Sequence, residues 1–423
     1  MTEKFKETFI GSIPQEWDTD KLENLCKIIT DGSHFSPKEY TGENGKIIAT
    51  VKNMDDFGFN INSCKRICVK DYETLVKNGC KPEKGDVLFS KDGTIGLTFV
   101  YDDEIELVLL SSIAILKVND RINPYFLKYY LQDKKTQDLI KSGHTSGSAL
   151  PRIVLKDLKL LEVVVPPINE QELIIKHLLA LDQKIELNQK MNQTLEKIGQ
   201  AIFKHWFMDF EFPDEDGRPY KSGGGEMVDS ELGDIPKGWK IVKVGDLIEL
   251  IYGKGLTKNK RNPGEIPVYG SNGITDYHNE AFVNGPGLII GRKGTVGKIH
   301  ISYGDFWPID TTYFVKSKID SIMIFWYYLL NSLNLDKMNV HSAVPGLNRN
   351  DVYEILIAIP NDNLFYKIEE ILKSLHDKID QNDKQSENLS QIRDSLLPKL
   401  MSGKIRLNKP INSNQELSKE LEA

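Results

Sequence analysis

The chain has 423 residues, of which 40% are hydrophobic and 27% charged, and its 54 basic and 61 acidic residues give a formal net charge of −7. This composition is typical of globular domains and excludes a disordered acidic protein or a collagen-like fibre. The acidic balance argues against a simple nucleic-acid coat, although it permits local basic patches.

No segment predicts a membrane anchor or an export signal. The longest apolar run, at residues 322–330, is too short to span a bilayer, and residues 1–10 lack the apolar centre of a signal peptide. We therefore expect a cytoplasmic protein with no membrane partner. The four cysteines fit that compartment as reduced thiols. Only Cys64 and Cys68 are close in sequence, so the alternative, a metal site, has weak support.

Residues 1–165 predict the first globular domain. Short apolar runs at 86–89 and 112–116, cut by turn residues, predict strands. Within the same domain, Asn123 and Pro124 predict the capped start of a helix.

A long helix is expected over 166–212, followed by a linker at 213–229 that is rich in Pro, Gly and acidic residues. The second globular domain is expected at 230–360 and a second long helix at 361–403. A polar tail at 404–423 ends the chain.

The second half of the chain repeats the first. Residues 91–96 (KDGTIG) return as 292–297 (RKGTVG), and residues 148–151 (SALP) return as 342–345 (SAVP), after which the offset stays at 194. A unit this long is a domain with an appended helix, not the short unit of a solenoid. We therefore predict the α+β class, with two α/β domains in a pseudo-twofold repeat separated by two long helices.

Both long helices carry an apolar stripe with a period of seven. Its members are Ile174, Leu181, Asn188, Leu195 and Ile202 in the first helix and Ile368, Leu375, Asn382, Leu389 and Leu396 in the second. Five heptads favour a coiled coil over the alternative, one helix face packed on its own domain. Each stripe has an asparagine at its centre, where a paired polar side chain can fix the register of two helices.

We expect the two helices to be antiparallel. The second globule starts where the first helix ends and stops where the second helix begins, and the termini of a domain usually lie close together. Antiparallel packing of equivalent helices places Asn188 beside Asn382 at the centre of the pair. The globules would then lie at opposite ends of a helix pair about 42 Å long.

The sequence lacks the common catalytic motifs. It has no phosphate-binding loop of the Gly-x4-Gly-Lys-Ser/Thr type, no Gly-x-Ser-x-Gly and no His-Glu-x-x-His. Residues 123–126 (NPYF) are similar to the catalytic motif of amino-methylating DNA methyltransferases, but the second proline and an upstream glycine-rich motif are missing. We interpret this segment as a helix cap, and we expect no catalysis, metal or cofactor on this chain.

Polar and basic turn residues recur in both globules and predict DNA binding. Arg and Asn side chains read base edges, while Lys, Ser and backbone amides hold phosphates. The alternative is a solvated surface, and His34 could equally be a structural histidine. The candidates are Ser33, His34, Lys52, Asn53, Lys91 and Thr94 in the first globule and Lys254, Lys258, Lys260, Arg261, Ser271, Asn272, Arg292, Lys293 and Thr295 in the second.

Three segments resemble one known family, the specificity (S) subunits of type I restriction-modification enzymes. They are residues 201–220, with AIFKHWFMDFEFP and GRPY, residues 233–239 (GDIPKGW) and residues 393–405 (RDSLLPKLMSGKI). The likeness runs from about residue 10 to residue 407. The motifs at the two helix ends are specific to this family.

The resemblance implies that the globules are two target recognition domains, each reading one half of a bipartite sequence in double-stranded DNA. The helices would act as a ruler and as docking surfaces for two methyltransferase (M) subunits, which bind S-adenosylmethionine. Restriction (R) subunits would add ATP- and Mg-dependent translocation and cleavage. Candidates for partner docking are Phe203, Trp206, Phe207, Leu396, Leu397 and Leu400, unless these side chains close the ends of the coiled coil instead.

Two other readings of the sequence remain. One is a DNA methyltransferase or nuclease with an unfamiliar site, which binding of S-adenosylmethionine by the isolated chain would support. The other is a coiled-coil scaffold whose globules bind protein. Salt-dependent binding to one preferred DNA sequence would exclude that scaffold.

Overall fold

The computed structural model describes residues 4–9, 11–55, 57–102, 105–143, 145–146, 152–319, 322–339, 346–360 and 362–407. Most of the predicted polar tail, from residue 408 on, and the repeated motifs at 148–151 and 342–345 lie outside these residues. The chain divides into two compact units. The first comprises Met1–Glu186 and Ser386–Ala423, and the second comprises Leu187–Gln385.

The first unit is built around two small sheets. The larger is antiparallel, with the order β4 (Cys26–Asp31), β10 (Ile113–Val118), β7 (Val87–Ser90) and β8 (Thr98–Val100). The smaller has the order β6 (Lys65–Ile67), β5 (Lys46–Ala49) and β9 (Leu107–Leu109), and β5 runs parallel to β9. The remaining elements are β1 (Phe5–Thr8), β2 (Gly11–Pro14), β3 (Asp18–Lys21), β11 (Thr145–Ser146), β12 (Arg152–Ile153), β13 (Glu162–Val165), α1 (Leu22–Leu25), α2 (Val69–Lys77), α3 (Pro124–Gln132), α4 (Lys134–Gly143) and α5 (Leu155–Lys159).

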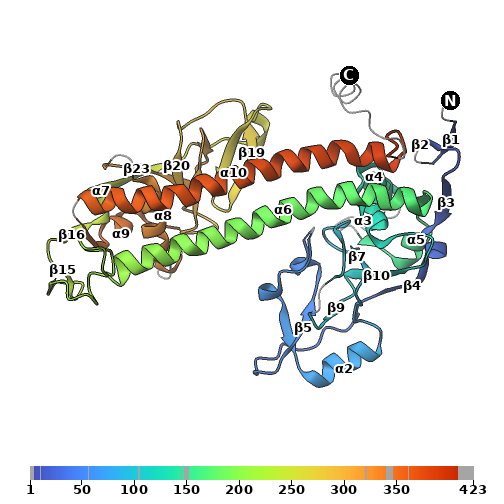
Figure 1. The fold of residues 1–423 in the computed structure, drawn as a ribbon, viewed down its shortest axis with the longest axis horizontal. Helices are drawn as coiled ribbons and strands as arrows, with labels where there is room; N and C mark the ends of the chain where they lie inside the picture. Colours follow the sequence, from blue (N-terminus) through green and yellow to red (C-terminus); the bar gives the residue numbers. More distant parts are fainter. Residues whose placement is uncertain are drawn as a thin grey trace. The chain divides into compact units, whose positions relative to one another are not determined.

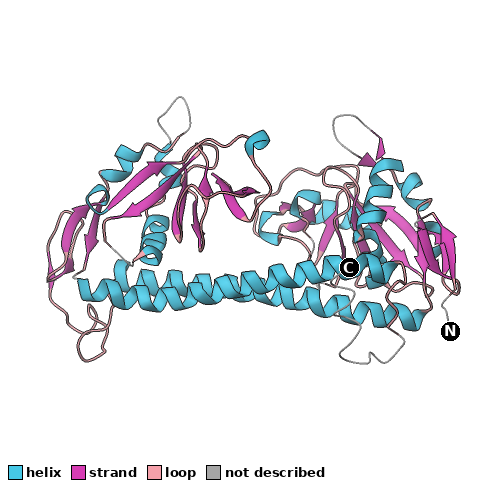
Figure 2. Ribbon diagram, turned by 90° about the horizontal axis from the view of Figure 1, so that it is seen from above, coloured by secondary structure: helices cyan, strands magenta, loops and turns pink. Residues whose placement is uncertain are grey.

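The second unit repeats the topology of these two sheets. Its larger sheet has the order β17 (Ile248–Tyr252), β23 (Thr312–Ser317), β20 (Gly287–Gly291) and β21 (Ile299–Ser302). Its smaller sheet has the order β19 (Gly273–His278), β18 (Ile266–Gly270) and β22 (Trp307–Pro308), with β18 parallel to β22. The remaining elements are β14 (Met227–Val228), β15 (Ile235–Pro236), β16 (Lys240–Lys243), β24 (Leu356–Ile359), α7 (Val244–Leu247), α8 (Met323–Ser332) and α9 (Arg349–Tyr353). Each unit therefore mixes strands and helices (Figure 2), and the predicted α+β class with two related α/β domains is confirmed.

Helices α3 and α8 are equivalent, but their first turns are capped differently. The Asn123 side chain accepts a hydrogen bond from the backbone N–H of Tyr125 at 3.0 Å, with Pro124 at the first position, which confirms that residues 123–126 are a helix cap. At α8 no side chain of the preceding residue caps the helix. The carboxylate of Glu369 instead accepts the N–H groups of Ile324 and Phe325, at 3.1 and 2.7 Å.

The long helices are α6 (Ile168–Phe203), which continues into a π-helical turn η3 (Lys204–Met208), and α10 (Asp362–Met401). Both long helices (Figure 1) are divided between the units. Residues 168–186 of α6 and 386–401 of α10 belong to the first unit, and the rest of each helix belongs to the second. In the first unit Asp182 meets Arg393 at 3.0 Å, and in the second unit Asn188 meets Asn382 while Glu196 meets His376. Residue numbers rise along one helix as they fall along the other, so the predicted antiparallel pairing is confirmed.

In each unit, the segments of α6 and α10 that belong to it complete the hydrophobic core. In the first unit Phe126 of α3, Leu178 of α6 and Leu400 of α10 belong to one buried apolar cluster. In the second unit Phe325 of α8 and Ile368 of α10 share a cluster with the end of α6. Burial of apolar surface therefore joins the helices to the sheets within each unit. Among the residues that the structure describes, no helix is both long enough and apolar enough to cross a membrane.

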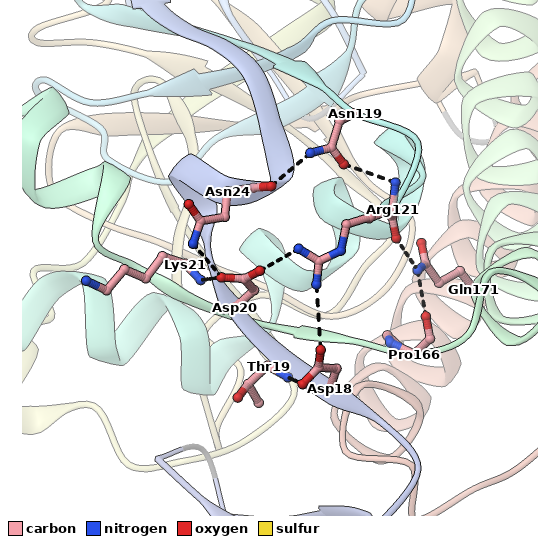
Figure 3. Close-up of polar contacts among 9 residues, drawn as sticks. All are labelled: Asp18, Thr19, Asp20, Lys21, Asn24, Asn119, Arg121, Pro166 and Gln171. Atoms are coloured by element: carbon pink, nitrogen blue, oxygen red, sulfur yellow. Dashed lines mark hydrogen bonds and ion pairs between the residues drawn. The ribbon is translucent and has the colours of Figure 1, made fainter.

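A polar cluster links the start of α6 to β3 and to the turn after β10 (Figure 3). Arg121 donates to Asp20 at 2.5 Å, and Gln171 of α6 donates to the backbone carbonyls of Arg121 and Pro166 at 3.1 and 2.8 Å. The hydrogen bond from Asn24, together with that from Arg121, lowers the pKa of Asp20 below its ordinary value. The members of the cluster bond to one another and to the backbone of the same unit, and we assign the cluster a structural role.

Candidate nucleic-acid interface

In the first unit the predicted DNA-binding loops meet at one end of the larger sheet. These loops follow β4, β5 and β7, and all three are hydrogen-bonded to the turn at residues 110–112. Ser111 donates its N–H to the carbonyl of Ser33 at 2.9 Å, and Lys91 donates its N–H to the carbonyl of Ser112 at 2.9 Å. The hydroxyl of Ser112 accepts the N–H of Val51 at 3.1 Å. One turn thus positions three segments that are far apart in the sequence.

The second unit assembles its loops in the same way. The turn at residues 309–311, which is equivalent to 110–112, accepts the N–H groups of Arg292 and Lys293 at the carbonyl of Thr311, at 2.9 and 3.1 Å. The residue before them is Gly291. A Cβ atom at this position would lie 2.0 Å from the carbonyl oxygen of Thr295, so a larger residue would clash. The loop after β18 also packs against Gly291, because a Cβ atom there would lie 3.0 Å from the carbonyl oxygen of Ser271.

Two of the six candidates in the first unit are structural. Lys91 is 1% exposed, and its ammonium lies 3.1 Å from the carboxylate of Asp31. Asn53 is also buried; it accepts the N–H of Thr50 at 2.9 Å and donates to the carbonyl of Ser63 at 2.8 Å. Both side chains therefore satisfy buried groups of their own domain, and their contact with DNA remains a prediction.

The other four candidates of the first unit reach its surface. Lys52 and Thr94 are exposed, and Ser33 is partly exposed. The imidazole of His34 is exposed as well, and its Nε2 lies 3.4 Å from the carboxylate of Asp31. His34 thus borders a carboxylate at the loop end without being buried in the domain.

The second unit keeps most of its candidates at the surface. Arg261 is the exception: it forms an ion pair with Asp276 at 3.0 Å and donates to the carbonyl of Leu256 at 3.1 Å, with a side chain that is 9% exposed. These contacts give Arg261 a structural role within its own unit, and its contact with DNA remains a prediction. Side chains that are exposed or half-exposed at this end are Lys254, Lys258, Lys260, Ser271, Asn272, Arg292, Lys293 and Thr295.

The sequence did not single out two further residues at this end. Tyr252, at the end of β17, is 48% exposed, and the guanidinium carbons of Arg292 and Arg349 lie 5.3 and 5.0 Å from the centre of its ring. Arg292 also donates to the carbonyl of Asp310 at 2.7 Å. Arg349 stands at the first position of α9, and the residue equivalent to it by the repeat offset is Leu155. A comparison of the two repeats therefore could not reveal it.

The residues predicted to dock partner subunits are covered by their own units. Phe203 and Phe207 are buried in the core of the second unit, with their rings stacked at 5.2 Å, and Trp206 packs partly buried against them. Leu397 and Leu400 are buried in the core of the first unit, and Leu396 packs partly buried beside them. Four of the six side chains are thus buried and two are partly buried, and their role in docking partner subunits remains a prediction. The alternative, that they close the ends of the helix pair, describes their packing.

The two central asparagines lie side by side. The side chain of Asn188 donates to the carbonyl of Asn382 at 3.3 Å and to the side chain of Gln385 at 3.0 Å. The side chain of Asn382 donates to that of Asn192 at 2.8 Å. Both central side chains are almost fully buried, so these bonds offset the cost of placing amides between the helices.

The cysteines offer no metal-binding arrangement. All four are free thiols, and burial raises the pKa of Cys26 to about 12, which keeps it protonated at neutral pH. Across the described ranges no group of three metal-ligating side chains occurs.

Comparison with known proteins identifies the family to which these paired sites belong. A family model described as the type I restriction modification DNA specificity domain matches residues 14–197 and 236–391. The chain belongs to this family. The two matched segments fall on the two repeats.

Curated relatives extend the likeness to nearly the whole chain. The chain is 27% identical over 434 residues to the type I restriction enzyme MjaIX specificity subunit of Methanocaldococcus jannaschii, covering 96% of this chain and 97% of that one. It is 25% identical to the HindI specificity subunit of Haemophilus influenzae, covering 81% of this chain and 91% of that one. The crystal structure of a type I S subunit from M. genitalium matches with a TM-score of 0.55 at 21% identity, over 95% of this chain and 99% of that one, and shares the fold.

Proposed function

We propose that this specificity subunit recognises a bipartite sequence in double-stranded DNA, with each unit reading one half through the loop end of its larger sheet. The observation that carries the proposal is the repeated loop end itself. Equivalent turns in the two units collect equivalent loops. Exposed cations gather there although the whole chain has a net charge of −7. Local cations in an acidic chain are an arrangement that favours a polyanionic ligand.

The exposed lysines suit the DNA backbone. Lys258 and Lys260 are exposed in the short helix η4 (Lys258–Lys260), and Lys52 and Lys293 are exposed in the loops after β5 and β20. Flexible ammonium groups neutralise phosphates without reading bases. In this proposal they set affinity and its salt dependence, while less mobile side chains at the same end read the base edges.

The proposal gives the helices two roles, as a spacer between the half-sites and as docking surfaces for two M subunits. Four of the six apolar candidates are buried, and Trp206 and Leu396 are partly buried, so more exposed side chains of the helices are stronger docking candidates. Ile198 of α6 and Ile392 of α10 are 42% and 47% exposed. They are separated by the repeat offset of 194 residues, so each helix presents one. Two equivalent apolar contacts suit two copies of one partner.

We expect catalysis and its cofactors on the partners. M subunits would supply S-adenosylmethionine, and R subunits would supply ATP and Mg for translocation and cleavage. This chain would contribute sequence recognition and assembly alone. The absence of common catalytic motifs from the sequence supports this division of labour.

The test is to purify the chain with its methyltransferase subunit, treat unmodified DNA and sequence the modified adenines. We expect one motif of two short half-sites around a spacer of fixed length. Methylation without any motif would overturn the reading role while leaving the scaffold in place. Failure to form a complex would favour a globule that binds protein instead.

A further inference from the structure

Tyr252 and the two arginines against its ring form a three-residue cluster at the second loop end. Two arginines, Arg292 and Arg349, lie against one half-exposed tyrosine ring, 5.3 and 5.0 Å from its centre. We propose that Arg349 is a specificity-determining residue that reads a guanine in the half-site of the second unit, with Tyr252 as its platform and Arg292 as its support. This inference rests on the proposed function of the same loop end.

The described part of the chain does not neutralise the charge of this cluster. Among the residues that the structure describes, no carboxylate lies within ion-pair distance of either arginine, whereas Arg261 nearby has Asp276 at 3.0 Å. Two guanidinium groups against one ring repel each other, and exposure to water only weakens that repulsion. An arrangement that costs free energy in the free protein indicates a ligand that supplies acceptors.

The two arginines are held in different ways. Arg292 donates from Nη2 and Nε to the backbone carbonyl of Asp310, at 2.7 and 3.3 Å. Part of the hydrogen-bonding capacity of its guanidinium is therefore already occupied. Arg349 makes its contact with the tyrosine ring, and the described residues provide no hydrogen-bond acceptor for its guanidinium. Arg349 thus presents a planar, pre-oriented set of five donors.

This geometry fits a base edge better than a phosphate. A phosphate is bound well by a mobile cation, as Lys258 and Lys260 can provide, and it carries no sequence information. Reading a base edge requires two parallel donors held in one direction, and the O6 and N7 atoms of guanine form the acceptor pair that matches a guanidinium. Stacking on an aromatic ring restricts the arginine in just this manner.

At the equivalent positions the first unit has no arginine–tyrosine cluster. Tyr252 pairs with Tyr313 across its sheet at the register where Asp31 pairs with Ala114, and Lys91 occupies the place of Arg292. Here Lys91 is buried against Asp31, so the equivalent place holds a neutralised pair. The proposed guanine contact is therefore specific to the second unit, and altering it should leave the other half-site unchanged.

The test compares motifs modified by the purified complex of this chain with its methyltransferase subunit, for the wild type, Arg349→Lys and Tyr252→Leu. Arg349→Lys keeps the charge and the surface position but removes the planar fork. We expect it to lower discrimination at one guanine of the second half-site by on the order of tenfold or more, with the first half-site unchanged. Tyr252→Leu should relax the same position. Lys293→Ala, a neighbouring exposed cation, is the control and should weaken modification evenly without changing the motif.

The outcomes separate the inference from the proposed function. A wild-type motif whose second half-site lacks guanine would overturn the inference alone. An unchanged motif with Arg349→Lys would also overturn it. So would an even loss across all sites in that variant, which would indicate a contact with the DNA backbone. A wild-type complex that modifies DNA without a bipartite motif would instead overturn the proposed function, and the inference with it.

Discussion

The loop ends of the two units have the same backbone arrangement but carry different side chains. At equivalent positions the first unit has Asp31 and Lys91, paired at 3.1 Å, and the second has Tyr252 and Arg292, stacked at 5.3 Å. The backbone N–H groups of Lys91 and Arg292 are bonded to equivalent turns, one in each unit. The comparison teaches that the fold fixes where a side chain stands, whereas the residue type decides whether that position stabilises the domain or faces a ligand.

The contacts that join the long helices to the rest of their unit also differ between the two units. In the first unit Asp182 of α6 accepts hydrogen bonds from Lys128 at 2.6 Å and Tyr129 at 2.8 Å. The residue 194 positions later is His376 of α10, whose two ring nitrogens lie 2.9 and 2.8 Å from the hydroxyls of Tyr303 and Tyr328. One unit thus uses a buried ion network where the other uses a neutral hydrogen-bond network.

The largest expected effect comes from breaking the charged network. Lys128 and Asp182 have side chains that are 7% and 6% exposed, so Asp182→Ala leaves a buried ammonium without its carboxylate. Although burial raises the pKa of Asp182, the charge and hydrogen bond of Lys128 hold it below its ordinary value, so the carboxylate is ionised at neutral pH. We expect a loss of about 3–5 kcal/mol in the free energy of unfolding, measured by urea denaturation.

The matched control for that variant is Asp380→Ala, which removes an ion pair with Lys384 on the surface of α10. It should cost about 1 kcal/mol or less. Equal losses in the two variants would show that the buried network contributes no more than an exposed pair.

A smaller effect should appear when the neutral network is acidified. Burial lowers the pKa of His376 from 6.5 to about 4. The unfolded chain therefore binds a proton between these values before the folded one does, and stability falls as pH falls from about 6.5 to about 4. Full protonation in this window corresponds to about 3 kcal/mol. Asp182, with a lowered pKa, should lose its contribution only at still lower pH.

The measurement is urea unfolding at pH 7 and pH 4.5 for the wild type and His376→Gln. The wild type should lose more stability on acidification than the variant, because glutamine does not titrate. An identical pH dependence in both proteins would refute the assignment. Glu196, whose carboxylate lies 3.7 Å from Nε2 of His376, and the adjacent Asp377 are the acidic groups that would oppose the effect.

The smallest expected effect is on partner binding, where equivalent substitutions in the two long helices should weaken binding equally. Ile198→Glu and Ile392→Glu each place a carboxylate at an equivalent exposed position, and each should weaken binding of one M subunit by about tenfold. Titration calorimetry or mass photometry should show one weakened site per variant and two in the double variant. Gln391→Glu, next to Ile392, adds the same charge and should have little effect. Loss of both sites in a single variant would contradict two equivalent docking positions.

Features that repeat in the sequence could be predicted from it. The offset of 194 residues located both long helices and the place of Asn188 and Asn382 between them, because heptads and repeats report periodic packing directly. The cap at Asn123 was also predictable, since its chemistry is confined to neighbouring residues.

Features that depend on distant residues could not be predicted. Lys91 looked like an exposed loop residue because its partner, Asp31, is 60 positions earlier, and only the sheet brings the two together. Phe203 looked like an exposed anchor because nothing near it in sequence shows that α8 covers it. Tyr252 and Arg349 are almost a hundred residues apart, and neither belongs to a repeated motif.

The central claim is that each unit reads its own half-site, and a domain exchange tests it most directly. Residues 230–360 would be replaced by the corresponding segment of a specificity subunit with a different target, keeping both long helices. The modified adenines would then be sequenced after treatment with the complex. We predict a motif in which one half-site is replaced and the other half-site and the spacer are retained. A motif that changes in both halves, or in neither, would contradict the account.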